Sequence, residues 1–173
     1  MPMPASCTLR PEAAADARAI EAATRAAFAQ APHSSHTEHL IVGALRAVGQ
    51  LAVSLVAECG GEVVGHVAVS LVTVDGRDVG WYGLGPISVL PRCQGQGLGG
   101  HLMRAALDSL RARQARGCVL LGEPAYYQRF GFRADPRLVL PGVPPDYFMA
   151  LAMQDGAVPT GTVAYSAAFN ATG

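Results

Sequence analysis

The chain has 173 residues, of which 50% are hydrophobic and 15% charged, and its 13 basic and 13 acidic side chains give a formal net charge of zero. This length suits one domain with a sizeable core, while the balanced charge provides no long-range field to hold nucleic acid. No apolar run approaches the roughly 20 residues of a membrane-spanning helix, so we expect neither a nucleic-acid-binding protein nor a membrane protein.

The first part of the chain predicts a strand followed by two helices. Residues 7–10 suit a short strand, and a proline and a glutamate then suit the first turn of an alanine-rich helix over residues 11–30. A polar segment breaks this pattern, and a second helix follows over about residues 37–48 before a glycine. Both helices therefore precede the predicted sheet.

Valine-rich segments predict the sheet itself. Residues 53–58 and 62–74 are joined by two glycines and predict an antiparallel hairpin, and residues 82–90 predict a third strand. Leucines and alanines then recur at helical spacing, which predicts a long helix over residues 97–115 that packs on the sheet.

The last third of the chain predicts shorter elements. Residues 118–121 suit a short buried strand, and residues 124–130 suit one or two helical turns. The proline-rich tail contains two more strand candidates, residues 147–153 and 162–169.

Nothing in the sequence divides the chain. It has no linker, repeat or low-complexity block, so we expect a single domain over residues 1–173, with a core of about residues 5–135 and C-terminal strands over residues 136–173. The N-terminus lacks a basic segment followed by a long apolar stretch, and it does not resemble a secretory signal. A cytoplasmic location is the default expectation.

The cysteines do not form a recognisable pattern. They are widely spread, with no Cys-x-x-Cys pair and no nearby histidine at zinc-ligand spacing, so we expect free thiols and no metal. The four are Cys7, Cys59, Cys93 and Cys118.

A glycine-rich loop between the third strand and the long helix is the most informative segment. Residues 94–100 read Gln-Gly-Gln-Gly-Leu-Gly-Gly. Glycines let a ligand approach the backbone, and the free N–H groups at a helix start carry positive partial charge. We expect this loop to bind a phosphate; the alternative is a glycine-rich turn that binds nothing.

The loop fits two phosphate-binding patterns. Gly95, Gly97 and Gly100 spell Gly-x-Gly-x-x-Gly, the dinucleotide fingerprint, and Glu123 stands about 20 residues further on, where that motif has its ribose-binding acid. A dinucleotide fold, however, puts this loop after its first strand and needs several strand and helix units beyond it. Here two helices and a hairpin come first and no second long helix follows, so we interpret the spacing to Glu123 as a coincidence.

The second pattern is Gln/Arg-x-x-Gly-x-Gly/Ala, which Gln94, Gly97 and Gly99 match. This is the pyrophosphate loop of the GNAT acetyltransferases. Three further segments also resemble the YhbS-like branch of that family, in the same order along the chain. They are residues 84–91 (Leu-Gly-Pro-Ile-Ser-Val-Leu-Pro), 122–132 (Gly-Glu-Pro-Ala-Tyr-Tyr-Gln-Arg-Phe-Gly-Phe) and 161–169 (Gly-Thr-Val-Ala-Tyr-Ser-Ala-Ala-Phe).

The resemblance implies a fold and an activity. The expected fold is the mixed α+β GNAT fold, with a mostly antiparallel central sheet, helices on both faces and a splayed pair of central strands. The expected activity is acetyl transfer from acetyl-CoA to a primary amine by direct attack on the thioester, without a metal. The sequence does not identify the acceptor substrate. Homodimers are common in this fold, and the apolar tail around residues 163–169 is the expected place for such a contact.

The resemblance also implies the residues that hold acetyl-CoA. The main chain of three strand residues would contact the pantetheine arm and the acetyl carbonyl, and the loop would hold the pyrophosphate. Arg92 or Arg104 would add charge at its edge; the alternative for either is a solvated surface side chain, which we favour for Arg104. The strand residues are Ile87, Ser88 and Val89, and the loop residues are Gln94, Gly95, Gln96, Gly97, Leu98, Gly99 and Gly100.

The family motif Tyr-x-x-x-Gly-Phe places a general acid at Tyr127. A phenol of ordinary pKa, about 10, suits the protonation of a thiolate whose pKa is about 8.5. The alternative is a packed tyrosine whose hydroxyl caps a backbone group.

Glu123 is the candidate for the general base, although similar sequences often carry Asp there, and a water chain is an alternative. Cys93 as an acyl-carrying nucleophile is a further alternative, for which no histidine partner is evident.

Other base candidates are His33, His36, Glu38 and Glu58, none of which fits a fixed family motif. Two other functions also stay open at this point. One is an acyl-CoA-binding module without catalytic activity, and the other is an oxidoreductase that binds a nicotinamide dinucleotide.

Overall fold

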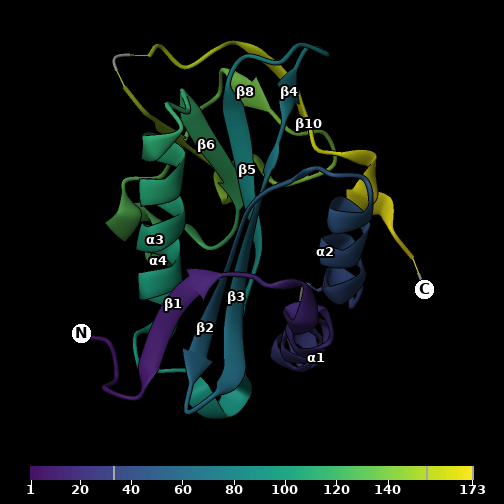
Figure 1. Cartoon of the computed structure of the whole chain (residues 1–173). Helices are drawn as coiled ribbons and strands as arrows, with labels where there is room; N and C mark the ends of the chain where they lie inside the picture. Colours follow the sequence, from purple (N-terminus) through teal and green to yellow (C-terminus); the bar gives the residue numbers. More distant parts are fainter. Residues whose placement is uncertain (33, 155, 173) are drawn as a thin grey trace.

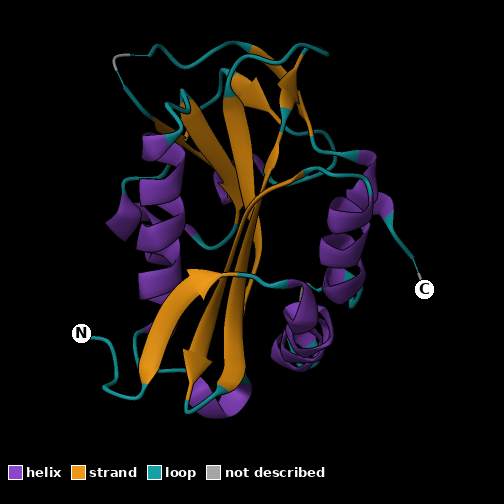
Figure 2. Cartoon of the chain, in the orientation of Figure 1, coloured by secondary structure: helices purple, strands orange, loops and turns teal. Residues whose placement is uncertain are grey.

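Figure 1 shows the computed structural model of the chain, which describes residues 1–32, 34–154 and 156–172. A seven-stranded sheet with the order β1-β2-β3-β5-β6-β9-β7 forms the centre. Helices α1 and α2 cover one face, and α3, with α4 beside it, covers the other (Figure 2). A small sheet of order β4-β10-β8 closes one end. This is the layered α+β arrangement expected from the sequence.

The strands of the described residues are β1 Cys7–Pro11, β2 Leu51–Cys59, β3 Glu62–Leu71, β4 Thr73–Val74, β5 Trp81–Val89, β6 Gly117–Leu121, β7 Arg133–Ala134, β8 Leu138–Val139, β9 Phe148–Ala152 and β10 Gly161–Ala164. The α-helices are α1 Ala17–Phe28, α2 Glu38–Ala47, α3 Leu98–Ala112 and α4 Pro124–Tyr127. Short 3-10 helices are η1 Ala14–Asp16, η2 Pro91–Cys93, η3 Gln128–Phe130, η4 Pro145–Tyr147 and η5 Ala167–Asn170.

The two central strands separate part-way along their length. Strands β1, β2, β3 and β5 pair antiparallel in that order, whereas β5 and β6 pair in parallel over Trp81–Gly83 only. The register of β3 on β5 shifts opposite Gly85 and Pro86, where a bulge or edge is expected of these residue types. The expected splay of the central strands is confirmed, and it leaves one side of the β5 backbone unpaired beyond Gly83.

The apolar face of α3 explains why this helix lies on the sheet. Its buried residues recur every three or four positions and pack against β2, β3 and β5. They are Leu98, Leu102, Met103, Ala106, Leu107 and Leu110. On the opposite face, α1 and α2 bury Ile20 and Val42 against Val56 of β2 and Ala68 of β3.

Three local predictions differ from the structure. The first helix begins later than predicted, because Pro11 still pairs in β1 with Leu55 and a 3-10 turn precedes α1. The predicted strand over residues 162–169 ends at Ala164, since the Ser166 hydroxyl accepts a hydrogen bond from the Ala168 amide and opens η5. Strands β7 and β8 are missing from the prediction, because two-residue strands carry no periodicity.

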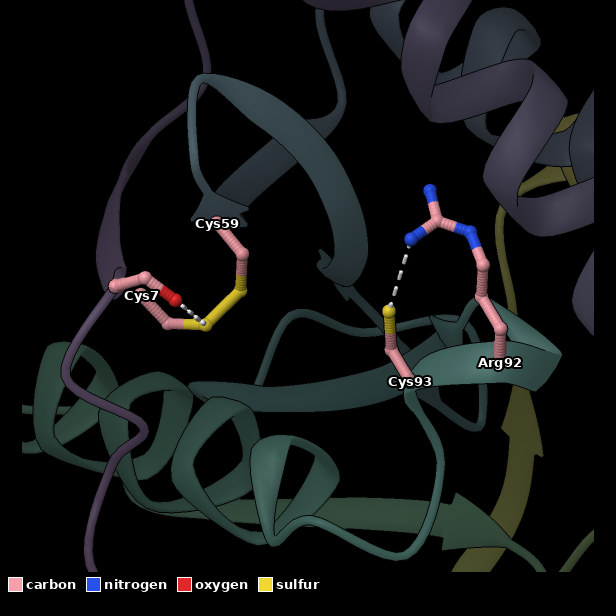
Figure 3. Close-up of a disulfide and its surroundings, with 5 residues drawn as sticks. Cys7, Cys59, Arg92 and Cys93 are labelled. Carbon is pink, nitrogen blue, oxygen red and sulfur yellow. Dashed lines mark hydrogen bonds between the residues drawn. A yellow bond between two sulfur atoms is a disulfide. The ribbon is translucent and has the colours of Figure 1, made fainter.

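The expectation of four free thiols is wrong. Cys7 and Cys59 form a disulfide (Figure 3), whereas Cys93 and Cys118 are free and buried. Cys7 and Cys59 are 52 residues apart in sequence but lie directly opposite each other in the β1–β2 ladder. Only the strand register brings them together. The cytoplasmic location rests on the N-terminal sequence alone and stays a prediction.

Within the described residues, no helix combines the length and the apolar character needed to cross a membrane.

Candidate functional site

The glycine loop connects β5, through η2, to the start of α3. Gly95 and Gly97 have φ angles of 77° and 85°, in the left-handed region that side chains disfavour. Gly97 is the N-cap of α3, and its carbonyl accepts from the His101 amide at 3.1 Å. The amides of Leu98, Gly99 and Gly100 precede that bond, so they have no partner within the helix. The loop therefore offers consecutive free donors at a positive helix end.

Side chains hold the loop in place around these amides. The Gln94 side-chain amide donates to the Val89 carbonyl at 2.9 Å, which ties the loop to the end of β5. The Tyr126 hydroxyl, from α4, lies 3.6 Å from the point where a Cβ on Gly99 would sit. The Met1 carbonyl is 2.9 Å from His101 Nε2. The loop is thus braced from β5, α4 and the N-terminal residue.

The two candidate arginines differ in what they contact. The Arg92 guanidinium pairs with the Glu62 carboxylate, and this hydrogen bond raises the pKa of Arg92. The Arg104 guanidinium lies 3.2 Å from the point where a Cβ on Gly100 would sit, and it stacks over the Phe130 ring. No carboxylate pairs with Arg104 among the described residues. Arg104 is therefore the cation better placed to serve the loop.

The end of β5 presents main chain to the split between β5 and β6. Ile87 and Val89 pack their side chains on the core that α3 covers. Ser88 points to the other face, where its hydroxyl meets the Thr24 hydroxyl of α1 at 3.2 Å, and both residues are buried. Since these side chains are occupied, only backbone groups remain for a ligand lying in the split.

Tyr127 lies on α4, just beyond the end of β6. Its ring packs against Gly122 and meets Tyr126 edge to face, with ring centres 4.9 Å apart. Burial, with a smaller contribution from Tyr126, raises the pKa of Tyr127 to about 12. Its hydroxyl has no hydrogen-bond partner among the described residues. The ordinary phenol pKa expected from the sequence is therefore wrong for this environment.

The base candidates are spread over the molecule. Glu123 is exposed at the N-cap of α4, and its carbonyl accepts from the Tyr126 and Tyr127 amides. The Glu58 carboxylate accepts from Arg10, and the Glu38 carboxylate accepts from Ser34. Both carboxylates therefore already have hydrogen-bond partners. His36 lies between α1 and α2 with a positive φ of 60°, and His33 lies outside the described residues.

Sequence reasoning missed a buried polar cluster beneath α2. His66, in the centre of β3, places Nε2 2.7 Å from the Ser54 hydroxyl, which donates to Glu12. Glu12 accepts two hydrogen bonds from Arg46 of α2, at 2.7 and 3.0 Å. Burial lowers the pKa of His66 to about 4, opposed by Glu12 and assisted by Arg46. A histidine inside a valine-rich strand was the only sequence signal for this cluster.

No group of three or more metal-ligating side chains occurs within residues 1–32, 34–154 and 156–172.

Comparisons with known proteins agree on one family. Residues 50–134 match the acetyltransferase (GNAT) domain. The uncharacterized N-acetyltransferase YhbS of Escherichia coli K12 is 38% identical over 169 residues, covering 94% of this chain and 98% of that protein.

Two solved structures are similar over nearly their whole length. A GNAT family acetyltransferase from Brucella melitensis, in complex with acetyl-CoA, is 48% identical with a TM-score of 0.85, covering 94% of this chain and 97% of that one. Escherichia coli YhbS in complex with CoA is 36% identical with a TM-score of 0.88, covering 100% of this chain and 97% of that one.

Proposed function

Because the chain belongs to the GNAT family of acetyltransferases, we propose that it transfers the acetyl group of acetyl-CoA to a primary amine by direct attack on the thioester. The observation that carries the proposal is the continuity of two binding surfaces. The unpaired backbone of β5 leads through η2 into the glycine loop at the start of α3. Such a surface suits a ligand with an extended, amide-bearing arm and a diphosphate at its end.

The pyrophosphate would lie on the amides of the loop from Gly95 to Gly100, because the Gln94 amide, which the sequence also assigned to it, already donates to the Pro91 carbonyl at 3.3 Å. Gly95 and Gly97 hold the loop in left-handed conformations that glycine adopts readily, and the dipole of α3 favours an anion at its first turn. Arg104 would supply the nearby positive charge, because Arg92 is already paired with Glu62. The start of α3 and Arg104 would thus hold the anion without lysine, which this chain lacks.

The pantetheine arm would pair with the main chain of Ile87, Ser88 and Val89 as an added strand. This placement brings the thioester into the split between β5 and β6. In the reaction, the amine nitrogen bonds to the acetyl carbon, the carbon–sulfur bond breaks, and the proton that nitrogen loses is balanced by the one that sulfur gains. The products are an N-acetyl amide and the CoA thiol.

Tyr127 is assigned as the hydrogen-bond donor to the leaving sulfur. With a pKa of about 12, the phenol stays protonated through the neutral range. Complete transfer of its proton to a thiolate of pKa about 8.5 would be uphill by about 3.5 pK units, or about 5 kcal/mol. A hydrogen bond that stabilises the departing sulfur, with solvent supplying the final proton, avoids this cost.

Glu123 is assigned as the group that passes the amine proton to solvent. Its side chain is exposed and makes no hydrogen bond among the described residues. A chain of water molecules can take over the same task, so we expect the loss of Glu123 to slow the reaction less than the loss of Tyr127.

The test compares two glycines with the same backbone strain. Gly95 and Gly142 have φ angles of 77° and 84°, and at neither does any atom lie within 4 Å of the point where a Cβ would sit. A Gly→Ala change at either site should cost about 1–2 kcal/mol of folding free energy, from the left-handed conformation. Only Gly95→Ala should also weaken CoA binding, by about tenfold or more, because it obstructs an amide–phosphate contact. Titration calorimetry with CoA measures this; equal CoA affinity in the two variants would refute the placement.

A further inference from the structure

The segment before β1 lies along the first turn of α3, and we call its residues, 1–6, the N-terminal strap (Figure 1). The Met1 carbonyl is 2.9 Å from His101 Nε2. The Cβ and Sδ atoms of Met1 lie 3.2 Å from the point where a Cβ on Gly97 would sit. Gly97 and His101 are four residues apart, so they share one side of the helix. The strap therefore supports one flank of the turn that would hold the pyrophosphate.

The strap leaves the other sides of this turn open. The point where a Cβ would sit approaches Tyr126 at Gly99 and Arg104 at Gly100, and no strap atom lies within 4 Å of either point. A ligand on the free amides of the turn would thus meet the strap beside it and not in its place. The strap can hold the helix start in its binding conformation without blocking it.

A disulfide fixes the base of the strap. Strand β1 is five residues long and lies at the edge of the sheet, and its pair Cys7–Cys59 closes the β1–β2 ladder at the end where the strap begins. The Ser6 carbonyl also accepts from the Gly60 amide at 3.1 Å. The last pair of a short edge strand opens easily. The covalent bond between Cys7 and Cys59 prevents this opening.

The disulfide and the glycine loop also share one region of the core. Cys7 belongs to the same buried cluster as Cys93 of η2 and Leu98, the first residue of α3, and Met3 of the strap packs against this cluster. Figure 3 shows the disulfide on one side of this region, with Arg92 and Cys93 of η2 on the other. A displacement of Cys7 therefore affects side chains that lie beneath the loop.

We propose that the Cys7–Cys59 disulfide is a redox switch that sets the affinity of the protein for CoA. The inference rests on the proposed function, because it takes the glycine loop as the pyrophosphate site. With the disulfide formed, the strap keeps the first turn of α3 ordered, and binding need not order it. With the disulfide reduced, the end of β1 and the strap separate from α3, and CoA binds more weakly.

The reductant of this switch is a dithiol. Cys59 is partly exposed and pairs with the edge strand, so a thiolate can reach its sulfur. Attack by one thiolate breaks the bond between the two cysteines, forms a mixed disulfide with Cys59 and releases the Cys7 thiolate. The second thiolate of the reductant then displaces the Cys59 sulfur and closes a disulfide within the reductant. Two electrons and two protons pass to the protein, which gains two thiols.

The test measures the Kd of CoA by titration calorimetry, before and after reduction with dithiothreitol. Reduction of the wild type should raise the Kd about 3- to 10-fold, comparable to the loss of one hydrogen bond. Cys59→Ser should bind CoA as the reduced wild type does and should not respond to dithiothreitol. Gly142→Ala, which is destabilised by backbone strain alone, is the control. It should bind CoA like the wild type in both redox states.

A second variant tests the route through the strap. His101→Leu keeps the disulfide but removes the ring nitrogen that lies next to the Met1 carbonyl. If the strap carries the effect, reduction should change the Kd of this variant clearly less than that of the wild type. Because linkage is reciprocal, saturating CoA should also make the wild-type disulfide harder to reduce, by the same factor as the change in Kd. Alkylation of the released thiols, at equilibrium with dithiothreitol, measures this factor.

Equal or tighter binding of CoA after reduction of the wild type would overturn the inference. A full response to reduction in His101→Leu would overturn it as well. Absence of CoA binding in both redox states would instead refute the proposed function.

Discussion

The buried His66 predicts a specific loss of stability in mild acid. Its imidazole is fully buried in β3, with Nε2 bonded to Ser54 and Nδ1 without a partner among the described residues. Because Ser54 donates its hydroxyl proton to Glu12, its oxygen accepts from His66, and the bound tautomer carries hydrogen on Nε2. Protonation would add a charge to a buried ring, beside the Arg46 cation that already pairs with Glu12.

The magnitude follows from the pKa of His66 in the folded and unfolded states. Burial lowers this pKa from 6.5 to about 4 in the folded protein, so between these values only the unfolded chain binds the proton. Stability therefore falls as the pH drops from 6.5 towards 4, with a total loss of about 3 kcal/mol. Hydrogen bonds from Arg46 and Ser54 outweigh burial and lower the pKa of Glu12 below 4.5, so its own contribution is lost at lower pH.

Urea unfolding at pH 7, 6 and 5, with the wild type and His66→Gln compared at each pH, measures the effect. The wild type should lose about 2 kcal/mol between pH 7 and pH 5. His66→Gln keeps a side-chain N–H group for Ser54 but cannot titrate, so its stability should fall clearly less over the same range. Parallel losses in the two proteins would refute the reasoning, as would a folded-state His66 pKa near 6.5 in an NMR titration.

The remaining predictions concern catalysis, cofactor binding and the disulfide. Tyr127→Phe should lower the rate of CoA release in a screen of primary amines by about 10²-fold while acetyl-CoA still binds; near-normal turnover would contradict its role. Arg104→Gln should weaken CoA binding in calorimetry several-fold more than Arg92→Gln, whose charge Glu62 already compensates; the reverse order would move the phosphate site towards η2. Cys59→Ser should lower the free energy of unfolding by about 2–4 kcal/mol, and a reducing agent should produce the same loss in the wild type but none in this variant.

Local sequence determined most of the secondary structure and the position of the glycine loop. The helical spacing of leucines fixed α3, and the two glycines at 60 and 61 fixed the β2–β3 hairpin. Gly95 and Gly97 stood out in the sequence as positions for an unusual backbone conformation, and both have the positive φ angles that favour glycine. Preferences of this kind depend on a few neighbouring residues. The folded chain keeps them because no tertiary contact favours a different local conformation.

The tertiary structure alone decided which distant residues meet. Cys7 and Cys59 looked like isolated thiols, and only the β1–β2 register makes them a disulfide. The raised pKa of Tyr127 depends on burial that the sequence does not encode locally. Ser70 and Tyr165, 95 positions apart in the numbering, both lie next to Gly83 because β3 pairs with β5 and the tail returns beside α2. Pairing register and the return of the chain are set by the packing of the whole core, so these contacts between distant residues could not be predicted from any single segment.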